Sequence, residues 1–450
     1  MSDPFDQSAL ARRAEALVAA ARAAGADSAD AVAVRGVSLS AQVRLAELEE
    51  LDRAEGDDLG LRVLIGRRQA VVSTSDPDEA GFKALAERAV AMAREAPEDP
   101  YARIAGPDEL GADFPELDLV DHGQPDADRL IARAQAAEAA ARDVAGVTNS
   151  GGASASWGLG GMVVATSAGF LGSYLGSHYS VSCQAIAGKG TGMERDYAFS
   201  SALHDEDLDS PEEVGRLAGS RAVRRLGPRK IDTARMPVIF DPRVARSLVD
   251  HVAAAASGAA IARGTSFLKD HLGQRILPAG IRILDDPLRR RGLRSRPFDG
   301  EGIATPPLDL VDDGVLKSWL LDLATAAELG LVTTGHARRG VRSAPSPGPT
   351  NLALMPGTLS ARDMIRETGR GLYVTDLIGH GVSLVTGDYS RGASGFLVEN
   401  GDLGGPVSEI TLAGNLSEML LGLAAADDLE WRYGTNAPTL RVEAMTVAGR

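Results

Sequence analysis

The feature that most constrains the fold is a stretch of helix-forming residues near the middle of the chain, from Asp241 to Leu268. Asp241 can cap the first free N–H groups of a helix, and Pro242 suits the first helical position because its missing N–H is not needed there. From residue 253 to residue 260 nearly every side chain is Ala, Ser or Gly, so neighbouring backbone can approach closely. The sequence therefore predicts a closely packed helix. Its expected buried face consists of Val244, Leu248, Val249 and Val252.

Metal chemistry on such a helix needs two His residues about one turn apart, with a Glu between them that can activate water. His251 is the single His of this helix, and the residues one turn beyond it are Ala254 and Ala255. Asp250 directly precedes His251, and adjacent helical positions diverge too far to share a face. We therefore expect no metal site here and interpret His251 as an ordinary helix residue, partly exposed or hydrogen-bonded.

Length and charge limit the classes of protein to consider. At 450 residues the chain is long enough for two or three domains. A formal net charge of −15 repels nucleic acid and anionic membrane surfaces, so neither is an expected partner. No positively charged start leads into an apolar run, and the single cysteine, Cys183, cannot form an internal disulfide. These features predict a cytoplasmic protein in which Cys183 fills space in a strand.

The first half of the chain alternates helical and strand-like patterns, which suits helices packed on one face of an antiparallel or mixed sheet. Residues 96–125 are rich in Pro, Gly, Asp and Glu and predict a solvated linker. The break at residues 227–230 is the expected boundary between an α+β domain of residues 1–227 and a second domain of residues 228–450. Helices are expected at 8–24, 79–95, 126–144 and 211–226, and strands at 31–37, 39–48, 60–65, 69–75, 147–157, 162–167, 171–187 and 193–201.

The second half predicts mostly strands around the central helix, which makes the fold class α+β. Residues 381–414 alternate apolar and polar residues between turns, a pattern typical of three antiparallel strands. Because exposed strand edges must be covered, we expect a closed or nearly closed, barrel-like β-structure with the central helix packed against it. The arginine-rich residues 289–296 predict a solvated loop, since no aromatic residues alternate with the arginines. Residues 333–350 predict a functional loop, with disorder as the alternative.

Several segments, taken in this order, resemble one family, the TldD and TldE/PmbA proteins. The resemblance covers nearly the whole chain and implies a subunit of a heteromeric metallopeptidase, from a family once described as modulators of DNA gyrase. Any one segment is weak evidence for the resemblance, but the order of all the segments along the chain is specific to this family. The segments are Gly60–Val63, Ser73–Asp76, Ala262–Leu268, Gly335–Arg339, Pro349–Leu352, Val385–Gly392 and Val398–Gly401.

The chain departs from the TldD branch at the expected zinc helix, His-Glu-x-x-x-His, and at a third ligand, a Cys near the C-terminus. Counting back from Gly264 places the two His positions on Val249 and Ala254 and the Glu position on Asp250, to within one residue. Residues 424–450 contain no Cys. The resemblance is therefore to the TldE/PmbA branch, and it implies no cofactor on this chain and zinc on a TldD-like partner subunit.

Two functions from different classes follow. The first is a non-catalytic subunit that shapes a cleft in which an unfolded or short peptide adds as a strand through backbone hydrogen bonds. The second is a free-standing regulator that binds another protein. A metal site built from His336, His380 or Asp250 is a remote third option, and Asp388 could equally serve a hairpin turn. The cleft residues that the resemblance implies are Arg339, Thr350, Asn351, Asp388, Tyr389 and Ser390.

Overall fold

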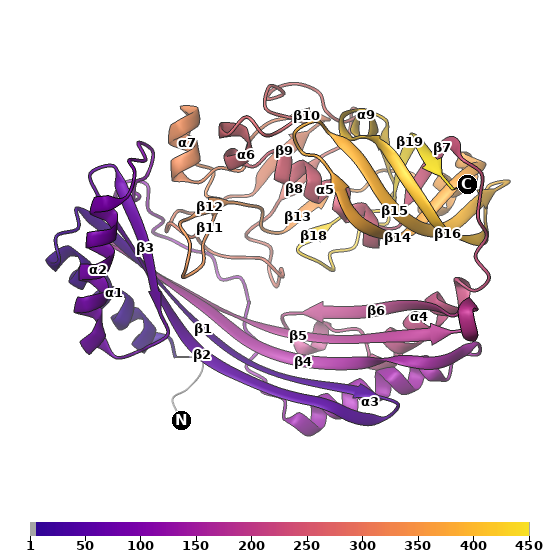
Figure 1. Cartoon of the computed structure of the whole chain (residues 1–450), viewed down its shortest axis with the longest axis horizontal. Coiled ribbons are helices and arrows are strands. Elements are labelled where there is room, and N and C mark those ends of the chain that lie inside the picture. The colour runs from indigo at the N-terminus through magenta and orange to yellow at the C-terminus, as the bar shows by residue number, and fades with distance from the viewer. Residues whose placement is uncertain (1–5, 450) are drawn as a thin grey trace.

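The computed structural model describes residues 6–449. A long curved sheet from the first half of the chain forms one layer, its helices cover the outer face, and the C-terminal half lies over the inner face (Figure 1). Within the described part of the chain, no helix combines the length and the apolar character needed to cross a membrane.

The N-terminal sheet has six strands in the order β3-β2-β1-β4-β5-β6, and every neighbouring pair is antiparallel. Three of its strands are longer than predicted: β1 and β4 each join two predicted strands, and β2 begins at Glu47 and not at residue 60, so the predicted strand 39–48 contains the turn between β1 and β2. Gly36 of β1 pairs with a glycine on each side, Gly56 and Gly160, so continuous pairing holds the strand together there. The strands are β1 (Ser28–Arg44), β2 (Glu47–Ile65), β3 (Arg68–Thr74), β4 (Val147–Thr166), β5 (Leu171–Ala187) and β6 (Glu194–Ala202).

Four helices cover this sheet at the predicted places. Asp126 caps α3 by accepting a hydrogen bond from the backbone N–H of Arg129, and Ser210 and Glu213 form a capping box at the start of α4. Helices α3 and α4 approach so closely that a Cβ on Gly215 would lie 2.0 Å from the carbonyl oxygen of Ala137. The helices are α1 (Ser8–Ala23), α2 (Phe82–Glu95), α3 (Ala127–Arg142) and α4 (Pro211–Arg224).

Residues 96–125 contain no helix or strand, yet they are more than a solvated connection. Leu117 is buried, and the ring of Phe114 lies 5.1 Å from the ring of Phe298 in the C-terminal half. Phe170 at the turn between β4 and β5 packs against the same ring. The apolar residues of this segment therefore help to join the two halves of the molecule.

Five strands of the C-terminal half close into a barrel. Their order is β16-β15-β14-β7-β19, and a further pairing between β16 and β19 completes the ring. Strands β7 and β14 are parallel, and the other neighbours are antiparallel. The expectation of a closed β-structure is confirmed. The strands are β7 (Ala234–Phe240), β14 (Arg370–Val382), β15 (Asp388–Glu399), β16 (Asp402–Asn415) and β19 (Leu440–Ala448), with β17 (Leu423–Ala425) paired to β19.

The central helix is α5 (Pro242–Ala255), and Asp241 caps it by accepting a hydrogen bond of 3.0 Å from the N–H of Arg243. The predicted single helix is wrong beyond Ala255, where the chain breaks and then forms the short α6 (Gly258–Ala262). The break occurs because the N–H of Gly258 donates to the carbonyl of Leu320. A Cβ on Gly258 would lie 2.6 Å from Thr325, so the small residues permit the close approach that the sequence predicted.

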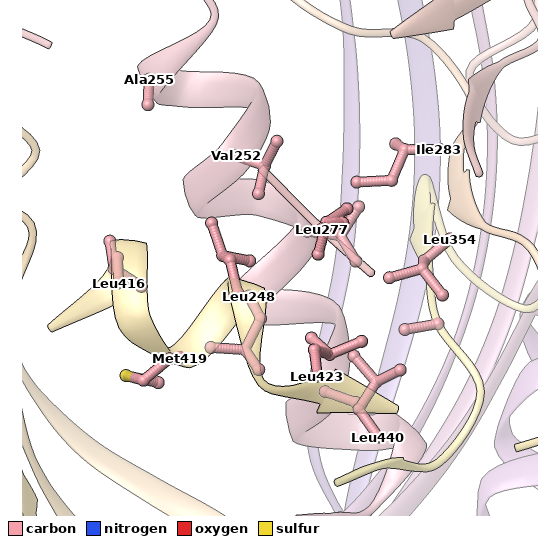
Figure 2. Close-up of a cluster of buried hydrophobic side chains, with 14 of the residues drawn as sticks. Leu248, Val252, Ala255, Leu277, Ile283, Leu354, Leu416, Met419, Leu423 and Leu440 are labelled. Carbon is pink, nitrogen blue, oxygen red and sulfur yellow. The ribbon is translucent and has the colours of Figure 1, made fainter. Parts of the chain in front are cut away.

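Helix α5 lies between the barrel and a second sheet, and its apolar side chains belong to both. Figure 2 shows Leu248 and Val252 of α5 close to Leu277, Ile283 and Leu354 from the side of the second sheet, and to side chains of the C-terminal segment. The second sheet has the order β10-β9-β8-β13-β18. Its strands are β8 (Ile283–Asp285), β9 (Leu308–Asp312), β10 (Val315–Leu316), β13 (Leu352–Leu354) and β18 (Thr435–Asn436); the smaller elements are β11 (Ala337–Arg338), β12 (Ser346–Pro347), α7 (Leu323–Leu329), α8 (Ala361–Thr368) and α9 (Leu416–Leu421).

Candidate functional site

The residues at the positions where the resemblance led us to expect zinc ligands lie on two different sides of α5. Val249 is buried in the core beside Leu248, so its side chain cannot reach solvent or a substrate. Asp250 and Ala254 are exposed one turn apart on the outer side, and Arg246 lies one turn before Asp250. The outer side of α5 therefore presents a guanidinium, a carboxylate and a methyl group in sequence.

This donor set does not fit zinc, which takes three or four Cys, His or carboxylate ligands. Asp250 is the single metal-binding group among these three side chains, and it is close enough to Arg294 to affect its pKa. Burial lowers the pKa of Arg294. The nearby Asp250 raises this pKa, and the positive charges of Arg338 and Arg246 lower it. Across residues 6–449, no three His, Cys, Asp or Glu side chains are grouped as metal ligands.

His251 lies next to Tyr389 of β15, with 6.2 Å between the ring centroids. Burial lowers the pKa of His251, and the nearby Arg391 lowers it further. The Nε2 atom of His251 and the hydroxyl of Tyr389 are both buried without a hydrogen-bond partner among the described residues. Tyr389 is 2% exposed and belongs to the core that α5 shares with the barrel. It is therefore an internal side chain and does not line an open cleft.

Arg339 also lies inside the protein, where the long loop of residues 333–350 meets the N-terminal sheet. Its side chain is 1% exposed and forms an ion pair with Asp30 of β1. Arg62 of β2 donates to the same carboxylate at 2.5 Å and 3.0 Å. Burial opposes ionisation of Asp30, but Arg339 and Arg62 together hold its pKa below the usual range. The loop is thus an ordered part of the contact between the two halves.

Two carboxyl groups, Asp299 and Glu301, are buried beside this ion pair. Burial is the main cause that raises the pKa of Glu301 to about 8, and the neighbouring Asp299 raises it further. Burial likewise raises the pKa of Asp299, although three backbone N–H groups donate to its carboxylate. We call the group formed by Asp30, Arg62, Asp299, Glu301 and Arg339 the buried junction.

Thr350 and Asn351 are each 1% exposed and serve as internal connections. The hydroxyl of Thr350 donates to Asp285 at 2.6 Å, and Nε2 of the buried His336 lies 2.9 Å from the same carboxylate. The amide of Asn351 donates to the hydroxyl of Ser295 at 2.7 Å. These polar groups hold the second sheet and its loops together.

Asp388 and Ser390 are the two exposed members of the expected cleft. Asp388 accepts a hydrogen bond of 2.7 Å from the hydroxyl of Thr386 in the turn before β15, which is the turn-forming role left open by the sequence. The six expected cleft residues therefore do not meet in one cleft, because four are internal and two lie on the outside of β15. His380 is exposed on β14, whereas His336 is buried in the second sheet and Asp250 lies on α5.

The surface has several hollows, and two of them adjoin each other between β6 and the segment that precedes β18. One cleft of about 470 Å³ is lined by residues of β6, α4, the start of α5 and the segment 428–437. A second, of about 410 Å³, adjoins it. Both include Phe199 and Tyr433, whose ring centroids are 5.3 Å apart. The sequence reasoning missed these residues, because Phe199 and Tyr433 are far apart in the chain and no local pattern connects them.

The arginine-rich residues 289–296 also have partners. Arg291 forms ion pairs with Asp118, Glu206 and Asp207. The guanidinium of Arg289 lies 4.1 Å from the ring of Trp431, so the aromatic contact that the local sequence lacked comes from a distant segment. The expectation of a merely solvated loop is corrected accordingly.

Three domain descriptions of the PmbA/TldA metallopeptidases match the chain: domain 1 at residues 29–93, the central domain at 121–226 and the C-terminal domain at 233–449. The metalloprotease PmbA homolog of Haemophilus influenzae is 39% identical over 93% of this chain and 92% of its own. The metalloprotease PmbA of Escherichia coli O157:H7 is 37% identical over 94% and 93%. A metalloprotease TldD homolog of Buchnera aphidicola is 25% identical over 42% of each chain.

Solved structures share the fold over almost the full length. A protein of Bacteroides thetaiotaomicron described as a modulator of DNA gyrase superposes with a TM-score of 0.90 at 25% identity, covering 98% of both chains. TldE from Thermococcus kodakarensis superposes with a TM-score of 0.87 at 21% identity, covering 97% of this chain and 100% of its own. Together with the matches in sequence, these show that the chain belongs to the TldD/PmbA family of metallopeptidases.

Proposed function

We propose that this chain is a zinc-less subunit of the TldE/PmbA type, which pairs with a zinc-bearing TldD-like subunit and helps to enclose a chamber for short or unfolded peptides. The observation that carries the proposal is the outer side of α5. There this chain presents Arg246, Asp250 and Ala254, although it belongs to a family of metallopeptidases. In a metallopeptidase, zinc polarises the attacked carbonyl and generates hydroxide. A methyl group, a guanidinium and one carboxylate cannot hold it, so catalysis is assigned to the partner.

The relatives support the PmbA branch over the TldD branch. Identity to PmbA proteins is 37–39% over more than nine-tenths of the chain, against 25% over 42% for the TldD homolog. We propose a cytoplasmic location, because the single cysteine, Cys183, cannot form an internal disulfide and is a free, buried thiol. With a net charge of −15, nucleic acid and membranes are not proposed as partners.

The test is a peptidase assay with separated and mixed subunits. Cleavage of an unfolded peptide is followed for this chain, for a TldD-like partner and for the mixture, with and without a chelator. We expect cleavage only when the partner is present, more cleavage in the mixture than with the partner alone, and loss with chelator. A mixture no more active than the partner alone, or subunits that do not co-elute, would favour the free-standing regulator instead.

Metal analysis of this chain alone provides a second check. The dialysed protein should hold no stoichiometric zinc, and Asp250→Ala and His251→Ala should leave the zinc content unchanged. Zinc near one per chain that is lost on replacing His251 would show that the metal-free assignment of α5 is mistaken.

A further inference from the structure

Aromatic side chains are scarce in this protein, and four of them gather at one place. The sequence has three Trp, seven Tyr and nine Phe among 450 residues. Tyr197 and Phe199 lie on β6, and Trp431 and Tyr433 lie in the segment that leads to β18. Phe199 and Tyr433 line both hollows between these elements, and Trp431 lines the second. We call these four side chains and the space between them the aromatic cleft.

The two sides of the aromatic cleft contact each other across the two halves of the molecule. Tyr197 and Phe199 are two residues apart on one strand, so they share a face, and their rings are stacked at 6.2 Å. Phe199 reaches across to Tyr433 at 5.3 Å. Their neighbours on β6, Asp196 and Ala198, alternate with them and are buried, whereas Tyr197 is 43% exposed. The rings therefore face the cleft and not the core beneath the sheet.

Guanidinium groups hold three of these rings in place. Arg243 lies 5.8 Å from the centre of Tyr197, Arg246 lies 4.5 Å from Tyr433, and Arg289 lies 4.1 Å from Trp431. Arg243 is itself anchored by an ion pair of 2.9 Å with Asp196. Rings that are fixed before a ligand arrives lose less conformational freedom on binding. The cleft is therefore preorganised.

The charges at the rim narrow the class of ligand. Asp209, Asp428 and Glu430 line the larger cleft, and carboxylates repel phosphate groups. Arg432 is already paired with Asp209 at 2.5 Å and with Glu430. Glu213 and Asp241 also line this cleft, so its five carboxylates outnumber the guanidinium groups of Arg221, Arg243 and Arg432, and its apolar wall includes Val214 and Leu217. A neutral ring with an apolar body suits this mixture better than a nucleotide does.

We propose that the aromatic cleft is a subsite that binds an aromatic side chain of an unfolded peptide. The proposal rests on the peptide-chamber function proposed above and adds a preference to it. An edge-on or offset contact with Phe199 and Tyr433 favours an aromatic ring over an aliphatic side chain of similar size by roughly twofold to tenfold. The peptide backbone then lies beside β6, which is the edge strand of the N-terminal sheet.

The direct test measures binding to this chain alone, without the partner. Two labelled unfolded peptides that differ by one residue, Phe or Leu, are titrated with the protein and followed by fluorescence anisotropy. The Phe peptide should bind about twofold to tenfold more tightly. Phe199→Leu should remove this difference by weakening the binding of the Phe peptide. Tyr101→Leu, which removes a ring that is 36% exposed outside the cleft, is the matched control and should preserve the difference.

Three results would overturn the subsite: equal binding of the two peptides, a preference that survives Phe199→Leu, or no binding of either peptide. Circular dichroism confirms that each variant is folded. The peptidase assay separates this proposal from the one on which it rests. An active mixture without aromatic preference overturns only the subsite, whereas an inactive mixture with an aromatic preference in this chain overturns only the subunit function.

Discussion

The N-terminal sheet meets the C-terminal half in two contrasting ways. At the buried junction, Asp30 and Arg62 of the sheet and Arg339 of the C-terminal half are almost completely enclosed, with side chains 1–3% exposed. At the aromatic cleft, the ion pair between Arg432 and Asp209 is 46% and 37% exposed. Both contacts join the same two halves, but the buried junction is enclosed and the aromatic cleft is open to solvent.

The difference shows where the molecule is fixed and where it can accommodate a ligand. A buried charge is costly once its partner is removed, so the buried junction tolerates little rearrangement. An exposed ion pair contributes little to stability and can be rearranged at small cost. Peptide binding is therefore expected at the open contact, while the buried junction holds the two halves in register.

The most direct way to break this comparison is to remove the central charge of the buried junction. Asp30→Asn leaves Arg62 and Arg339 buried without a carboxylate between them, which should lower the free energy of unfolding by about 3–5 kcal/mol. Urea denaturation followed by circular dichroism measures the loss. The control is Glu87→Gln, which removes a pair with Lys83 on the surface of α2 and should change little. A loss below about 1 kcal/mol for Asp30→Asn would contradict the assignment.

The pH dependence of stability offers a second test, through Glu301. Its pKa is raised from 4.5 to about 8 in the folded protein, so the folded state binds more protons between these values. Stability from this group is complete below pH 4.5 and is lost as the pH rises toward 8. Between pH 6 and pH 8 the loss should be about 2 kcal/mol, because the slope of about 1.4 kcal/mol per unit falls to half as the pH reaches the folded-state pKa.

Glu301→Gln removes the titrating proton and should flatten this decline, so that the variant gains relative stability as the pH rises. Thermal unfolding at a series of pH values gives the comparison. Parallel pH profiles for the two proteins would show that Glu301 does not titrate in this range and that the buried junction holds its charges differently.

A third test compares two glycines on the same strand, β2. A Cβ on Gly60 would lie 2.2 Å from the carbonyl oxygen of Val341, where the C-terminal half rests on the sheet, whereas a Cβ on Gly56 meets nothing within 4 Å. Gly60→Ala must push the two halves apart and should cost about 2 kcal/mol. Gly56→Ala should be close to neutral or slightly stabilising. Equal effects of the two substitutions on the unfolding midpoint would mean that the backbone at Val341 can move aside to accommodate a methyl group on residue 60.

The sequence predicted the fold better than the site, for a physical reason. The cap at Asp241, the close packing around Gly258 and the closed barrel follow from local rules on caps, small residues and covered edges. The internal positions of four of the expected cleft residues could not be predicted, because their burial depends on distant partners. Thr350, for example, hydrogen-bonds to Asp285, 65 residues earlier in the chain.

The aromatic cleft was invisible for the same reason. Tyr197 and Phe199 are two residues apart, as are Trp431 and Tyr433, and each pair alone is typical of an ordinary strand or loop. Only the fold brings Phe199 to Tyr433. Spacing rules act over a few residues, and no local pattern states that two such pairs will face each other.

The smallest expected effect belongs to the open contact. Arg246→Met keeps the length of the side chain and its packing but removes the charge that lies 4.5 Å from the ring of Tyr433. Arg246 donates one further hydrogen bond, to the backbone carbonyl of Arg243, and has no carboxylate partner among the described residues, so no buried charge is left unpaired. The free energy of unfolding should therefore fall by only about 0.5–1 kcal/mol, measured by the same urea denaturation. A loss of 3 kcal/mol or more, comparable to that of Asp30→Asn, would mean that the rings of the aromatic cleft are as essential to the fold as the buried junction. The contrast between a fixed contact and an adaptable one would then fail, and a binding role for the cleft would lose its physical basis.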